Sequence, residues 1–89
     1  MAQIVFTQQL ARFLPAPQLA TDAGTLRAAL DGILATNARL AGYVLDDQGH
    51  LRENVVIFID GQRTRERDRL DDPLRPDSTV HILQALSGG

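Results

Sequence analysis

Apolar residues alternate with other positions near the start of the chain, and this pattern predicts a first β-strand over residues 2–7. Ile4 and Phe6 share one face of that strand. A weaker, edge-like strand is predicted over residues 18–21, because a proline comes directly before it and proline suits a strand start or an edge.

The strongest strand signal is the run of five consecutive apolar residues within residues 54–59. A strand this apolar is expected to be central and buried on both faces. Asp60-Gly61 follows it and predicts a hairpin turn, since these residues tolerate positive φ angles. A last strand is predicted over residues 79–84, with His81 on the face opposite its apolar partners.

One helix is predicted between the early and late strands. Its apolar residues fall at helical spacing and form a single stripe: Leu26, Ala29, Leu30, Ile33 and Leu34. Asp22 or Thr25 is expected to cap its start, and its end is expected near residues 36–38. Residues 40–45 continue as a short turn or a second helical piece, with Gly42 as the expected break.

This order of elements predicts an α+β roll, in which a mixed sheet of four to five strands packs on one main helix. The first and last strands are expected to pair in parallel at the sheet centre. The 89 residues allow one small domain, expected over residues 1–84, followed by a flexible tail over residues 85–89.

Composition excludes several functions. Cysteine is absent and only two histidines occur, so no thiolate chemistry and no metal site are expected. The net charge of −2 argues against nucleic acid as a partner. No run approaches the roughly 18–20 apolar residues that span a bilayer, and no signal peptide is recognisable, so a cytoplasmic protein is expected. No catalytic constellation is present, and we therefore expect no enzyme activity of its own.

The last residues, Leu86-Ser87-Gly88-Gly89, form the most suggestive segment. Glycine lacks a Cβ, so Gly88 and Gly89 could extend through a narrow channel and present an unhindered carboxylate to another enzyme. The alternative is an ordinary frayed end, because chain termini are often poorly ordered.

Three segments together resemble the ubiquitin-like sulfur carrier family: Phe58-Ile59-Asp60-Gly61, then Asp77-Ser78-Thr79-Val80-His81-Ile82-Leu83, then Ala85-Leu86-Ser87-Gly88-Gly89. The chain looks most similar to the cysteine-pathway and molybdopterin-type carriers. It departs from them at Gln84, where those carriers more often have proline. This departure weakens the assignment to one pathway, but it does not weaken the resemblance to the family.

The resemblance implies a β-grasp fold and a carrier role. An adenylyltransferase partner would use ATP to activate the Gly89 carboxylate, and a sulfur donor would convert it to a thiocarboxylate. A downstream synthase would accept the sulfur, and the chain would bind no cofactor itself. A ubiquitin-like modifier or interaction module without sulfur transfer is the alternative. The sequence leaves open the pathway, and whether Gly89 is the encoded end or is exposed by proteolysis.

Partner docking has four candidate residues: Phe58, Arg63, Arg65 and His81. All nine basic residues are arginine, and those from Arg63 to Arg69 alternate with other residues. If extended, they could line one side and contact an acidic partner. The alternatives are a solvated loop for the arginines and an ordinary packed strand position for His81.

Overall fold

The computed structural model describes residues 1–7, 10, 18–64 and 69–84. The predicted tail over residues 85–89 therefore lies outside the described residues. In chain order the elements are β1 (Ala2–Phe6), β2 (Gln18–Thr21), α2 (Leu26–Leu34), α3 (Ala38–Val44), β3 (Val55–Ile59), β4 (Gln62–Arg63) and β5 (Thr79–Gln84).

The five strands form one mixed sheet in the order β2-β1-β5-β3-β4. The first and last strands pair in parallel, with Ile4 opposite Val80 and Phe6 opposite Ile82. The other pairs, β1 with β2, β3 with β4 and β3 with β5, are antiparallel. The prediction of a parallel pair at the centre of a mixed sheet is confirmed.

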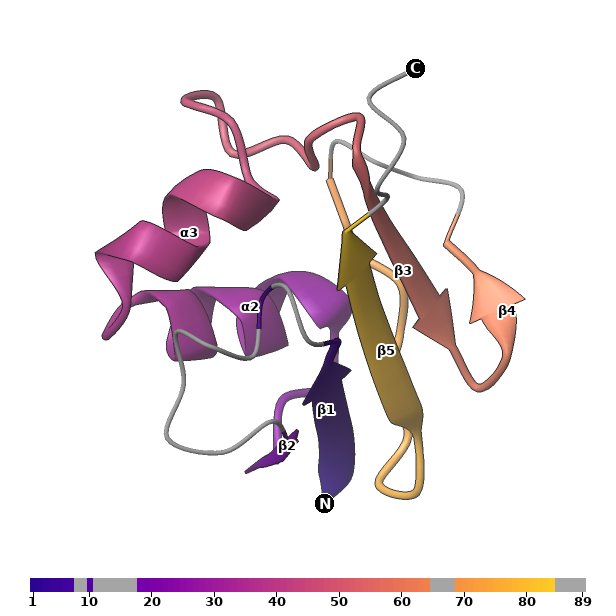
Figure 1. Ribbon diagram of the computed structural model, residues 1–89. Helices are drawn as coiled ribbons and strands as arrows, with labels where there is room; N and C mark the ends of the chain where they lie inside the picture. The colour runs from indigo at the N-terminus through magenta and orange to yellow at the C-terminus, as the bar shows by residue number, and fades with distance from the viewer. Residues whose placement is uncertain (8–9, 11–17, 65–68, 85–89) are drawn as a thin grey trace.

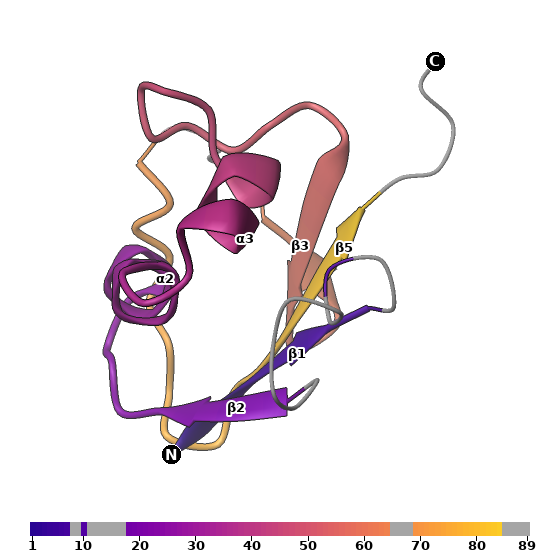
Figure 2. The same cartoon turned by 60° about the vertical axis from the view of Figure 1, so that its left-hand side comes forward.

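Helices α2 and α3 lie on the same side of the sheet, and no other described helix or strand covers the opposite side (Figures 1 and 2). The core forms between these two layers, because the apolar stripe of α2 and the inward residues of the strands exclude water from each other. Its fully buried large side chains are Ile4, Leu10, Leu26, Leu30, Leu40, Val44, Val55, Ile57, Leu70, Val80 and Ile82.

Local capping sets the limits of the helices. Thr25, and not Asp22, caps α2, where its hydroxyl accepts a 3.2 Å hydrogen bond from the Ala28 backbone N–H. The Asn37 side chain accepts a 3.1 Å bond from the Leu40 N–H and begins α3. The helix α2 therefore ends at Leu34, before the predicted range. Residues 40–45 prove to be mostly a second helix, and Gly42 lies inside it instead of ending it.

The expectation that the strand at Val55–Ile59 is central and buried on both faces is wrong. The central strand is β5, and β3 lies between β5 and the two-residue β4. Val55 and Ile57 are fully buried, whereas Val56 and Phe58 on the other face are half-buried. The reason is that the helices cover only one face of the sheet, and an apolar run does not show which faces will be covered.

The Asp60-Gly61 turn is confirmed. Both residues have positive φ angles, 52° and 84°, as a two-residue hairpin turn requires. The turn brings Arg63 opposite Phe58. Within the described residues, no helix is long and apolar enough to cross a membrane.

The two faces of β3 should respond differently to truncation. Ile57→Ala leaves a cavity in the core and should lower the free energy of unfolding by about 2–5 kcal/mol. Val56→Ala, the adjacent residue on the open face, should cost about 1 kcal/mol or less, since half-exposed sites lose little burial. Urea denaturation of both variants measures this difference, and equal losses would contradict the one-sided burial of β3.

Candidate functional site

The strand β5 is the element that leads to the predicted reactive tail. Its last residue, Gln84, directly precedes residues 85–89. Leu86, Ser87, Gly88 and Gly89 lie outside the described residues, so their roles stay predictions. The described part of the candidate site is the strand that carries the tail and the sheet surface beside it.

The end of β5 is paired on both sides up to Ile82. The Ile82 carbonyl accepts a 3.1 Å hydrogen bond from the Thr7 N–H, just after β1. The next residues, Leu83 and Gln84, lie opposite Val56 and Val55 of β3. The chain therefore leaves the sheet from a position fixed by its neighbouring strands.

The start of β5 is fixed by Asp60 at the opposite end of the sheet. The Asp60 carboxylate accepts a 2.8 Å hydrogen bond from the Thr79 N–H, and its other oxygen lies 3.5 Å from the Arg75 guanidinium. The bond from Thr79, followed by a bond from the Ser78 side chain and the charge of Arg75, lowers the pKa of Asp60. Each of these three interactions stabilises the ionised form of the Asp60 carboxylate.

Three of the four predicted docking residues form one row across the open face of the sheet. Phe58 lies opposite His81 of β5 on one side and opposite Arg63 of β4 on the other. The row continues to Val5 of β1, which lies opposite His81. Residues directly opposite each other on paired strands share a face, so these side chains are neighbours.

The structure describes only part of the predicted line of arginines from Arg63 to Arg69. Arg65 and Arg67 lie outside the described residues, and β4 ends at Arg63. Arg69 is exposed, and its carbonyl accepts a 3.1 Å hydrogen bond from the Arg27 side chain. Arg63 is therefore the one member of this line that the described structure places in the row.

Sequence analysis missed the apolar residues beside this row. Val5, Val56 and Leu83 are half-buried, as the predicted residue Phe58 is, and none of the four belongs to the core or to the partly buried residues packed against it. The sequence contains a signal for these open-face positions, because each of these residues alternates with an inward residue of the same strand. We call Val5, Val56, Phe58, Arg63, His81 and Leu83 together the open-face strip.

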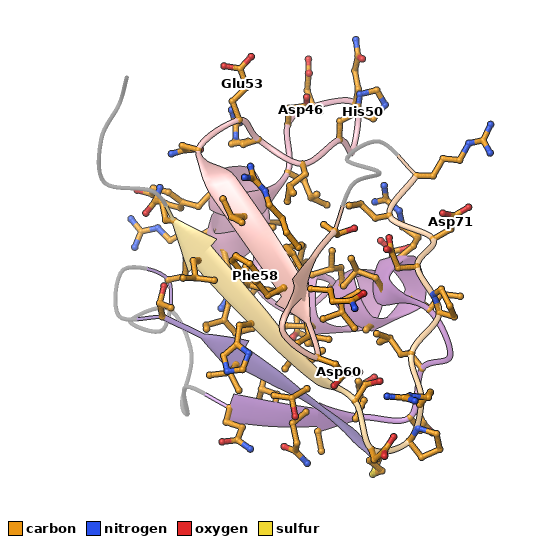
Figure 3. The ribbon with its side chains drawn as sticks, turned by 90° about the vertical axis from the view of Figure 1, so that its right-hand side faces the viewer. Asp46, His50, Glu53, Phe58, Asp60 and Asp71 are labelled. Atoms are coloured by element: carbon orange, nitrogen blue, oxygen red, sulfur yellow. The ribbon has the colours of Figure 1, made fainter. Side chains whose placement is uncertain are left out.

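Arg63 is the one permanently charged residue of the open-face strip. Among the described strand positions on this face, the ionisable side chains are those of Arg63 and His81. Both are exposed, and neither makes a hydrogen bond or ion pair with another described residue. Figure 3 shows Phe58 on this face, whereas Asp46, Glu53 and Asp71 lie in surrounding loops and Asp60 lies at one end.

The Asp46 carboxylate accepts hydrogen bonds from its own loop. Its carboxylate accepts hydrogen bonds of 3.0 Å from the His50 N–H and 2.9 Å from the Gln48 N–H. The bond from His50, opposed by partial desolvation and assisted by the bond from Gln48, lowers the pKa of Asp46. These bonds close the loop, and Asp46 does not contribute to the open face.

A cleft of about 450 Å³ lies beside the Asp60-Gly61 turn. Its charged residues are Asp60, Asp72, Arg63 and Arg75, so the two signs balance. It is at the end of the sheet opposite Gln84 and is remote from the start of the tail. In the part of the chain that the structure describes, no group of three His, Asp or Glu residues could hold a metal ion.

These elements define a β-grasp fold of the ubiquitin-like type. The chain is similar to the Haloferax volcanii SAMP1 structure, with a TM-score of 0.78, 19% identity, and coverage of 99% of this chain and 98% of that one. A chain of the Amycolatopsis orientalis BexX/CysO complex gives a TM-score of 0.82 at 13% identity, with full coverage of both chains.

Mycobacterium tuberculosis CysO gives a TM-score of 0.81 at 18% identity, and the match covers 97% of this chain and all of that one. These neighbours are ubiquitin-like sulfur carrier and modifier proteins. No protein-family model and no curated protein matches the sequence. At these identities, the likeness establishes the fold.

Replacing Asp60 by Asn should test how β5 is fixed. Asn tolerates the positive φ of this position, so the change removes mainly the charge. Because the pKa of Asp60 is lowered on folding, its stabilising effect is complete above the unfolded pKa of about 3.9 and is lost as pH falls through the folded pKa. Asp60→Asn should therefore lower the urea midpoint at neutral pH, and the difference should shrink in acid.

Asp31→Asn provides the matched control. Asp31 is exposed on α2, and its charge pairs with Arg27 only at 3.8 Å. Such surface pairs contribute little, so this variant should stay close to the parent chain at both pH values. Identical midpoints for Asp60→Asn and Asp31→Asn at neutral pH would contradict a special role for Asp60.

Proposed function

We propose that this chain is a ubiquitin-like sulfur carrier whose Gly89 carboxylate is converted to a thiocarboxylate by partner enzymes. The observation that carries this proposal is the position of β5. It is the central strand of a β-grasp sheet, and the segment that follows it reads Ala85-Leu86-Ser87-Gly88-Gly89. We also propose that the protein is cytoplasmic and that it belongs to the ubiquitin-like sulfur carrier family.

The fold suits a protein that presents its own C-terminal segment to partner enzymes. Both edges of β5 are paired, and its start is bonded to Asp60, so the strand is a rigid base for the segment beyond it. Gly88 and Gly89 have no side chains that would block a narrow active-site channel. Leu86 and Ser87 would enter that channel first and contact its walls.

The proposed chemistry requires an activating enzyme and ATP. A carboxylate resists nucleophilic attack, because its leaving group would be oxide. The Gly89 carboxylate attacks the α-phosphorus of ATP and releases pyrophosphate, and the product is an acyl-adenylate. Hydrosulfide from a sulfur donor then attacks the carbonyl carbon, AMP leaves with the C–O bond pair, and a proton is released.

The resulting thiocarboxylate keeps the sulfur nucleophilic and attached to a protein that partners can recognise. A downstream synthase would accept this sulfur. The chain would supply the carried group and the docking surface, while the partners would supply catalysis. The candidate docking residues are Phe58, Arg63, His81 and, beyond the described residues, Arg65.

A protein modifier is the second candidate function, and it is favoured by the structural likeness to SAMP1, a small archaeal modifier protein. In that case the activated Gly89 carbonyl would be transferred to an amine of another protein. The chain contains no lysine, so its own side chains could not accept such a link.

Intact-mass measurement separates the two functions. The full chain is incubated with the adenylyltransferase of its source, ATP and hydrosulfide. We expect it to gain the mass difference between one sulfur atom and one oxygen atom, and to become reactive toward alkylating reagents at its end. Removal of ATP or hydrosulfide should abolish this gain, because each supplies one reactant of the proposed steps.

Two variants control the experiment. Deletion of Gly89 should abolish the gain, since the carboxylate would then lie one residue short of the active site. Asp31→Asn, on the helix side of the molecule, should gain the same mass as the parent. An unchanged mass for the full chain, or an equal gain after deletion of Gly89, would contradict sulfur transfer. Conjugates to other proteins in a lysate would support the modifier function instead.

A further inference from the structure

We propose that the cleft beside the Asp60-Gly61 turn binds a free α-amino acid. The Arg63 and Arg75 guanidiniums bind its carboxylate, and the Asp72 carboxylate binds its ammonium group. This inference goes beyond the proposed function and does not rest on it. It rests on three features of the cleft: its walls are bonded to each other, its available charged groups have both signs, and its size suits a small molecule.

The walls of the cleft come from two separate parts of the chain that are bonded to each other. The hairpin of β3 and β4 forms one wall, and the loop that leads into β5 forms the other. The Thr64 hydroxyl, which is buried, donates a 2.9 Å hydrogen bond to Asp72. The Asp60 carboxylate accepts its 2.8 Å bond from the Thr79 N–H. A cleft whose walls are joined at two points keeps its shape before a ligand binds, as most small-molecule sites do.

Both guanidiniums of the cleft have N–H groups that no described residue uses. Arg63 is exposed and makes no hydrogen bond or ion pair with another described residue. Arg75 pairs with Asp60 at 3.5 Å through Nη2 and with Asp77 at 3.7 Å through Nε, and its side chain is 73% exposed. These pairs leave Nη1 of Arg75 without a described partner. Because a guanidinium presents its donors in a planar fork that matches a carboxylate, both arginines suit the acid group of a ligand.

One of the two carboxylates in the cleft is available to a ligand as well. Asp60 already accepts the Thr79 N–H and is bonded to the Ser78 side chain and to Arg75. Asp72 is partly exposed and accepts the Thr64 hydroxyl at Oδ1, whereas its Oδ2 makes no bond with another described residue. An ionised carboxylate forms charge-assisted hydrogen bonds with an ammonium group. Asp72 is therefore the anion that suits the amino group of a ligand.

The presence of both signs in one cleft selects a zwitterion. A ligand with negative charge alone would also meet the two carboxylates, and a ligand with positive charge alone would also meet the two guanidiniums. Like charges placed close together are unfavourable. An α-amino acid carries a carboxylate and an ammonium group on one carbon atom, so it satisfies both kinds of side chain at once.

The size and the apolar residues of the cleft are consistent with such a ligand. The volume of about 450 Å³ lies within the range of roughly 300–1,000 Å³ that is typical of small-molecule sites. Ile59 and Pro73 also line the cleft, so an apolar side chain on the amino acid would cover apolar surface of the protein. L-leucine is therefore a suitable probe.

A titration of the ¹⁵N-labelled full chain with L-leucine tests the proposal. Backbone amide shifts are followed by NMR at constant pH and ionic strength. We expect saturable shifts that are largest at the Asp60-Gly61 turn and in residues 72–78. The dissociation constant should be on the order of millimolar, because contacts between partly exposed charges are individually weak.

Two analogues of L-leucine provide matched control ligands. The analogue 4-methylpentanoate lacks the ammonium group, and 3-methylbutylamine lacks the carboxylate. Each analogue loses one attraction and keeps the repulsion from the groups of like charge. Each should therefore bind about tenfold more weakly than L-leucine, or not at all.

Two substitutions should change which of the three ligands the cleft prefers, a result that loss of structure alone would not give. Asp72→Asn can still accept the Thr64 hydroxyl, so it should keep the walls joined. It should weaken binding of L-leucine by about tenfold and strengthen binding of 4-methylpentanoate. Arg63→Gln should weaken binding of L-leucine by about threefold or more and strengthen binding of 3-methylbutylamine, while Arg75 still holds part of the carboxylate.

Arg39→Gln is the matched control variant. It makes the same change at an exposed site on α3, on the helix side of the sheet, and should leave all three affinities unchanged. Urea midpoints confirm that each variant is folded.

Several outcomes would overturn the proposal. These are shifts centred away from the cleft, absence of saturable shifts, equal binding of L-leucine and its two analogues, equal loss of affinity in Arg39→Gln, or shifts that sodium chloride reproduces at the same concentration. The mass experiment is independent. A chain that binds L-leucine in the cleft but gains no sulfur contradicts sulfur transfer alone. A chain that gains sulfur but fails the titration contradicts the amino-acid site alone.

Discussion

The double pairing of β5 is the interaction on which the rest of the structure depends. This strand pairs in parallel with β1 and antiparallel with β3, so it joins the two halves of the sheet. Its inward residues, Val80 and Ile82, lie opposite Ile4 and Phe6 and close the core under the helices. Without β5, the β1–β2 pair and the β3–β4 hairpin would not be joined in one sheet.

The arrangement of helices on a single side gives the sheet two chemically different faces. The two described helices, α2 and α3, cover one of these faces. The inward side chains form the core, whereas Val56 and Phe58 face the open side in a half-buried state. Fully buried and half-buried side chains therefore alternate along the same strands.

The charged side chains that are bonded within the fold differ from those on the open face. Asp60 is bonded to the start of β5, and Asp46 is bonded within its own loop, so both carboxylates stabilise backbone geometry. The side chains of Arg63 and His81 in the open-face strip make no such bonds to described residues. Hydrogen bonds with the backbone lower the pKa of both Asp46 and Asp60.

Local sequence determined much of this protein. The period-two pattern of Ile4 and Phe6, the helical stripe from Leu26 to Leu34 and the positive-φ turn at Asp60-Gly61 specify their elements through short-range chemistry. Phe58, Arg63 and His81 were predicted from the sequence as docking residues; the structure places them in one row, and docking itself stays a prediction. Gly42 was expected to interrupt residues 40–45, but it lies inside α3, because the Asn37 cap together with buried Leu40 and Val44 outweighs the low helix propensity of one glycine.

Tertiary structure alone decided which strand is central and which face is covered. The five apolar residues of β3 have the pattern of a strand buried on both sides, but burial depends on where the helices pack and not on the strand itself. The membership of Val5 and Leu83 in the open-face strip likewise required the register of β1 against β5, a contact between opposite ends of the chain. Such pairings are set by long-range packing, which no local pattern encodes.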